Sequence, residues 1–133
     1  MTKKDSSLKV LGLDISTKTI GWALFDNVEQ RLVELTHFSP VIKPQPENKI
    51  EHLLKKADAF KEKLEQVKDF GICKVIIEEP LLTSNNVYTV GTLLRYNSII
   101  CKVVYDVLGL VPEFISTYES RKFAFSSLFT ENK

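Results

Sequence analysis

Short apolar runs in the first third of the chain predict three β-strands. The runs cover Lys9 to Ile15 (KVLGLDI), Gly21 to Phe25 (GWALF) and Arg31 to Phe38 (RLVELTHF), and the third one alternates roughly between apolar and polar residues. Continuous apolar runs are typical of strands covered on both faces, whereas alternation is typical of strands with one exposed face. The short link from Asp26 to Gln30 predicts that the second and third strands form a hairpin.

The rest of the chain alternates between helical and strand patterns. Apolar residues at three- and four-residue steps predict helices, and capping boxes mark where two of these helices begin. The expected elements are a helix opened by Asn48 to Glu51, a strand over Cys73 to Glu79, a helix over Val87 to Leu108, a strand over Pro112 to Ser116 and a last helix opened by Ser116 to Glu119.

This order of elements predicts an α/β domain with a five-stranded mixed sheet flanked by helices. Because crossovers between parallel strands are right-handed, we expect the fourth strand beside the first and parallel to it, in the sheet order 3-2-1-4-5. The carboxyl ends of these two strands then lie together, which is where open α/β sheets bind ligands. Asp14 and Glu78 both fall at this place.

Two carboxylates that lie close together repel each other unless a cation is bound between them. Mg²⁺ (or Mn²⁺) takes oxygen ligands and keeps positions for water and phosphate, and paired ions of this kind promote phosphodiester cleavage. The alternative is structural, with Asp14 accepting hydrogen bonds from turn amides and Glu78 at a solvent-facing strand end. Pro80 holds Glu79 extended. Strand parity does not decide which glutamate points inward, because we expect this strand to be covered on both faces.

Composition changes this picture little. The 133 residues suffice for one domain, and the 44% apolar and 26% charged fractions are typical of a soluble globular protein. No apolar run is long enough for a membrane span or a secretion signal, so we expect a cytoplasmic protein. Cys73 and Cys101 lack the spacing of a zinc site and are expected to be reduced core residues, while His37 and His52 are isolated.

The net charge of +1 does not distinguish between function classes. A protein that coats duplex DNA is far more basic, but an enzyme that touches DNA with one face needs only a local basic cluster.

Two segments resemble a known family. VLGLDISTKTIGWALFD (residues 10–26) is similar to the first motif of RuvC-type nucleases of the ribonuclease H-like superfamily, and to the first such segment of CRISPR effector nucleases. VIIEEPLL (residues 75–82) resembles the second motif. The likeness extends over roughly Lys9 to Phe125. It implies a ribonuclease H-like fold and an endonuclease (hydrolase) that cleaves branched DNA, as Holliday junction resolvases do in recombination and repair.

The resemblance also implies roles for single residues. Asp14 and Glu78 take the metal-binding positions with Mg²⁺ or Mn²⁺ as the cofactor, Glu79 is the reserve ligand, and Lys122 falls near the scissile phosphate. A homodimer is implied because junction resolvases cut two symmetric strands. The expected domain covers residues 1–133.

One departure from the family concerns its last acidic ligands. The family places one or two acids on a final helix, and Glu131 is a poor substitute for them. We therefore expect the domain to be incomplete at its C-terminal end, or to receive ligands from a partner, or to have a degenerate site.

Several polar residues are candidates for contacts with DNA, mainly with backbone phosphates, which position a nucleic acid more than they select its sequence. For each of them an ordinary surface role is the alternative. The candidates are Ser16, Thr17, Lys18, Asn85, Asn86, Arg95, Tyr118 and Arg121.

Two other functions compete with a nuclease. Sugar kinases and actin-like ATPases share the sheet topology and a similar first motif, but they need a longer, two-lobed chain, so only a fragment would fit; stabilisation by ATP would favour them. A non-catalytic DNA-binding or dimerisation module of the same fold would explain the missing acids, and failure to bind Mn²⁺ through Asp14 would favour it.

Overall fold

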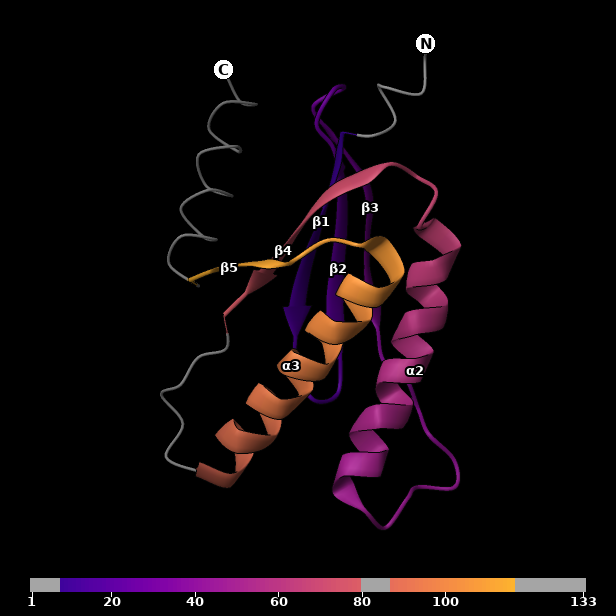
Figure 1. Ribbon diagram of the computed structural model, residues 1–133, viewed down its shortest axis with the longest axis vertical. Helices are drawn as coiled ribbons and strands as arrows, with labels where there is room; N and C mark the ends of the chain where they lie inside the picture. The colour runs from indigo at the N-terminus through magenta and orange to yellow at the C-terminus, as the bar shows by residue number, and fades with distance from the viewer. Residues whose placement is uncertain (1–7, 80–86, 117–133) are drawn as a thin grey trace.

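The computed structural model of the chain describes residues 8–79 and 87–116 (Figure 1). Within these ranges the strands form one mixed sheet in the order β3-β2-β1-β4-β5. The elements are β1 (Lys9–Ile15), β2 (Ile20–Asp26), β3 (Arg31–Phe38), α2 (Lys49–Val67), β4 (Ile72–Glu78), α3 (Val87–Leu108) and β5 (Glu113–Ile115). The α/β class and the predicted strand order are confirmed.

The centre of the sheet is β1, which pairs antiparallel with β2 and parallel with β4. β3 continues the sheet antiparallel to β2, and β5 continues it parallel to β4. The connection through α2 carries the chain from β3, at one edge of the sheet, past β2 and β1 to β4, which lies beside β1 and parallel to it as predicted. This pairing brings the carboxyl ends of β1 and β4 side by side.

The hydrophobic core lies between one face of the sheet and the two helices, which lie side by side across it (Figure 1). Alternate residues of β1, among them Leu11 and Leu13, point into this core and are almost fully buried. Trp22 of β2 packs edge-on against Phe60 of α2, with ring centroids 6.1 Å apart. Phe60 is fully buried and also contacts the ring of Phe38 at 6.5 Å.

Asn48 caps the start of α2 as predicted, while the carboxylate of Glu51 lies 3.9 Å from Nζ of Lys55. The amide of Glu51 donates to Oδ1 of Asn48 at 3.0 Å, which satisfies one of the free amides of the first turn. The expected apolar face of this helix is buried at Leu53, Ala57, Phe60 and Leu64.

The hairpin between β2 and β3 is closed by Asp26. Its Oδ1 accepts hydrogen bonds from the amides of Val28 at 2.9 Å and Glu29 at 3.0 Å. These backbone hydrogen bonds, that from Glu29 first, lower the pKa of the Asp26 carboxyl. The carboxylate of Asp26, the last residue of β2, therefore stabilises the turn of the predicted hairpin.

Some expected boundaries differ by one residue. β2 begins at Ile20 and β4 at Ile72, each one residue before the predicted position, and β5 is shorter than predicted. Cys73 is exposed instead of lying in the core, because β4 is fully buried only at Val75 and Ile77 in its second half. The last predicted helix lies outside the described residues. Neither described helix is long and apolar enough to cross a membrane.

We predict that Phe60→Ala lowers the free energy of unfolding by about 3–5 kcal/mol, because it leaves a cavity between α2 and the sheet. Phe70→Ala is the matched control, since Phe70 is 48% exposed, and it should cost less than about 1 kcal/mol. Urea denaturation measures both values. Equal losses in the two variants would contradict this description of the core.

Candidate functional site

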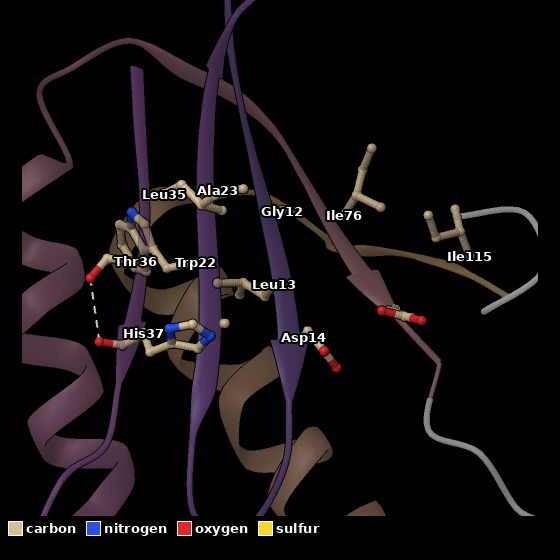
Figure 2. Close-up of a pocket in the computed structure, with 12 residues that line it drawn as sticks. Gly12, Leu13, Asp14, Trp22, Ala23, Leu35, Thr36, His37, Ile76 and Ile115 are labelled. Carbon is tan, nitrogen blue, oxygen red and sulfur yellow. Dashed lines mark hydrogen bonds between the residues drawn. The ribbon is translucent and has the colours of Figure 1, made fainter. Parts of the chain in front are cut away.

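The face of the sheet opposite the helices carries a pocket of about 330 Å³. Figure 2 shows the residues that line it, and most of them alternate with the buried core positions of their strands. Asp14 and Glu78 both line this pocket, so the structure brings the two predicted acids to one place. The other lining residues are Gly12, Leu13, Gly21, Trp22, Ala23, Leu35, Thr36, His37, Ile76 and Ile115.

The strand register orders these residues into a row across all five strands. His37 pairs with Gly21, and Gly21 pairs with Asp14. The parallel pairing of β1 with β4 ends at Leu13 and Ile77, so the next residues are Asp14 and Glu78. Glu78 in turn pairs with Ile115. We call the sequence His37, Gly21, Asp14, Glu78 and Ile115 the acid row.

Two small residues lower the floor of the pocket at its centre. In the row beside the acid row, Ala23 and Gly12 lie between Leu35 and Ile76 on neighbouring strands. In the acid row a Cβ atom at position 21 would lie only 3.3 Å from Cβ of Asp14. Gly21 therefore leaves space beside Asp14 that a side chain would fill.

The two carboxylates are available for a ligand. Asp14 is exposed and Glu78 is half-buried. In the described part of the chain, neither carboxylate forms a hydrogen bond or an ion pair. The structural alternative for Asp14 required hydrogen bonds from turn amides, which the described turn does not provide.

The burial pattern of β4 shows which of the two glutamates faces the pocket. Val75 and Ile77 point into the core, so Ile76 and Glu78 point to the pocket face, which no described element covers. Glu79 follows the end of β4, is exposed and does not line the pocket. Its amide donates to the carbonyl of Ile115 at 2.7 Å, which fastens the end of β4 to β5.

The turn after Asp14 is closed by Ser16. The Ser16 hydroxyl donates to the carbonyl of Thr19 at 2.8 Å and accepts from its amide at 3.1 Å. Behind the turn, Nζ of Lys56 on α2 donates to the carbonyl of Thr17 at 2.6 Å. Burial, and then the positive charge of Lys18, lower the pKa of the Lys56 ammonium group. Ser16, Thr17 and Lys18 thus lie on the turn that follows Asp14, and neither they nor Lys56 line the pocket.

The remaining predicted contact residues do not join the pocket. Arg95 is exposed on α3 and does not line it. The others lie outside the described residues, so their predicted roles stay predictions: Asn85, Asn86, Tyr118, Arg121 and Lys122.

His37 is a pocket residue that the sequence analysis set aside as isolated. It stands on β3, and Figure 2 shows its imidazole extending from β3 toward β2. The hairpin register could have found it, because alternation along β3 and the short link after Asp26 place His37 on the same face as Asp14.

Two carboxylates are the acidic groups that line the pocket. Among residues 8–79 and 87–116, no three histidine, cysteine or acidic side chains lie close enough together to hold a metal ion. Two carboxylates on one pocket fit an ion that binds one or two protein carboxylates and keeps its other positions for water and substrate phosphate, as Mg²⁺ does. They do not form a complete protein cage.

Comparisons with known proteins support the fold. The sequence matches no family model and no curated protein. The structure is similar to RuvC from Thermus thermophilus in complex with a Holliday junction substrate, with a TM-score of 0.67 and 14% identity over 86% of this chain and 68% of that chain. A second Thermus thermophilus RuvC structure gives a TM-score of 0.54 with 19% identity over 81% of this chain and 63% of that chain.

A PPX-GPPA enzyme from Aquifex aeolicus is also similar, at a TM-score of 0.45 and 14% identity over 82% of this chain and 36% of that chain. That likeness is too low to support an argument about function. The likeness to RuvC, at its low identity, establishes a ribonuclease H-like fold. This chain covers less than two thirds of the second RuvC chain.

We predict opposite effects of alanine at the two pocket glycines. Gly21→Ala should destabilise the protein by about 1–3 kcal/mol, because its Cβ crowds that of Asp14. Gly12→Ala is the control, since its Cβ would meet Ala23 at ordinary contact distances of 3.8 and 4.0 Å, and it should be neutral or stabilising by up to about 1 kcal/mol. Thermal unfolding measures both; a Gly21→Ala variant as stable as the wild type would contradict the crowding.

Proposed function

We propose that this chain is a RuvC-type nuclease domain that hydrolyses phosphodiester bonds in branched DNA with Mg²⁺ or Mn²⁺. The observation that carries the proposal is the convergence of Asp14 and Glu78 on one pocket from strands far apart in the sequence. The likeness in fold to RuvC bound to a Holliday junction supports branched DNA as the substrate class.

In this proposal Asp14 and Glu78 hold the cation, and Glu79 is not a ligand. The cation would supply Lewis-acid activation of the phosphodiester and of the attacking water. The residues of the chain hold it at the end of β1, where the small side chains of the floor let a backbone phosphate approach. Further ligands would come from outside the described residues or from a partner, and with two carboxylates alone we expect weak metal binding.

Lys18, which is exposed on the turn after Asp14, would contact the DNA backbone. Lys56 would position this turn, because its ammonium group donates to the carbonyl of Thr17 from the side of α2. Ser16 is less suited to contacting DNA than the sequence suggested, because its hydroxyl already closes the turn. A homodimer, which would present two such sites to a symmetric junction, is part of the same proposal.

A non-catalytic module of the same fold is the second candidate. The specific observation in its favour is that the described residues offer no metal site with three protein ligands. Such a module would bind branched DNA without any dependence on Mn²⁺, and this distinguishes it from a nuclease.

We predict that Asp14→Asn and Glu78→Gln each abolish Mn²⁺ binding, measured by isothermal titration calorimetry. Nicking of a branched DNA should fall by more than about 100-fold, as when one charged group that stabilises a transition state is removed. The fold should persist, because Asp14 is exposed and Glu78 is only half-buried.

Glu79→Gln is the matched control. It removes a neighbouring charge that does not line the pocket, so Mn²⁺ binding and nicking should stay at the wild-type level. Unchanged nicking in Asp14→Asn, or equal losses in Glu78→Gln and Glu79→Gln, would contradict the proposed ligand pair.

A further inference from the structure

We infer that His37 contacts the scissile phosphodiester and holds it over Gly21, opposite the acid pair. This inference rests on the proposed function of the pocket and adds a residue to it. It starts from the register, which places His37, Gly21 and Asp14 on three adjacent strands in one row. All three line the same pocket, in which Figure 2 labels His37 and Asp14.

His37 and Asp14 lie on either side of β2, where Gly21 lies between them. In a sheet, the residue between two such positions normally fills the space above the middle strand with its side chain. Here the middle position has no Cβ, and one built there would lie 3.3 Å from Cβ of Asp14. The space above β2 is therefore open between the imidazole and the carboxylate.

The span of this space suits a phosphate group. Adjacent strands lie about 4.8 Å apart, so the Cα atoms of His37 and Asp14 are separated by about 10 Å. A cation on a carboxylate binds a phosphate oxygen at about 2.1 Å, and an imidazole N–H donates to an oxygen at about 2.9 Å. A single phosphate can therefore place one oxygen on the cation beside Asp14 and another against the imidazole of His37.

The imidazole has the chemistry and the freedom for this contact. His37 is exposed, and within the described residues its ring forms no hydrogen bond. Outside the sheet ladder, its backbone carbonyl accepts a hydrogen bond from the hydroxyl of Thr36. Figure 2 shows the ring directed from β3 toward β2, which is the direction of Gly21. Neutral or protonated, an imidazole retains an N–H that can donate to a phosphate oxygen.

The closing experiment compares the two histidines of the chain. His52 lies on α2, away from the pocket, and is the matched control. His37→Ala should reduce kcat/KM for branched DNA by about 10–100-fold, the effect of losing one charge-assisted hydrogen bond. His37→Gln keeps an N–H donor and should recover part of this loss. His52→Gln should match the wild type, and all three variants should keep their Mn²⁺ affinity.

A second readout does not depend on turnover. The ring C–H signals of the two histidines are followed by NMR while a dinucleotide with one phosphodiester is added in the presence of Mg²⁺. The His37 signal should move and the His52 signal should not, and Asp14→Asn should suppress the movement. Wild-type kcat/KM in His37→Ala, or a stationary His37 signal, would overturn the inference. Loss of Mn²⁺ binding in His37→Ala would also overturn it, because His37 would then be a metal ligand.

Failure of the proposed function gives a different pattern. A wild-type chain that neither binds Mn²⁺ nor nicks DNA would refute the nuclease proposal. In that case movement of the His37 signal on addition of the dinucleotide would support a phosphodiester contact made by His37 without the cation, and a stationary signal would refute both.

Discussion

The alternation of side chains along β1 is the constraint on which the rest of the structure depends. Leu11 and Leu13 point to the helices and are buried, whereas Gly12 and Asp14 point to the opposite face and line the pocket. A slip of one residue in the register would place the carboxylate in the core and a leucine in the site. The same pairing that builds the core therefore fixes where the acid stands.

The strongest local patterns predicted the fold. The bounds of β1, β3 and α3 agree with those expected from the sequence, because each of these elements has a clear apolar period. The cap at Asn48 fixed the start of α2 through a hydrogen bond that the structure contains. Weaker signals gave errors at the ends, as at Cys73, which precedes the exposed Lys74 and lies outside the buried second half of β4.

The site was predicted only in part, and the reason is geometric. Topology placed Asp14 and Glu78 at neighbouring strand ends, but the choice between Glu78 and Glu79 depended on which faces of β4 are covered. His37 was missed because it is distant from Asp14 in sequence and lies two strands away. Only the registers of both β2 pairings, taken together, place it in the acid row.

The parallel pairing of β1 with β4 also limits when the site can exist. The strands β1, β2 and β3 are joined by short turns, and their contacts need little loop closure. Glu78 reaches Asp14 only after the chain has passed through the whole of α2 and closed a long loop. A folding intermediate that contains the three-stranded meander alone has one acid without its counterpart. Divalent ions that need both carboxylates can therefore stabilise only states in which this crossover is complete.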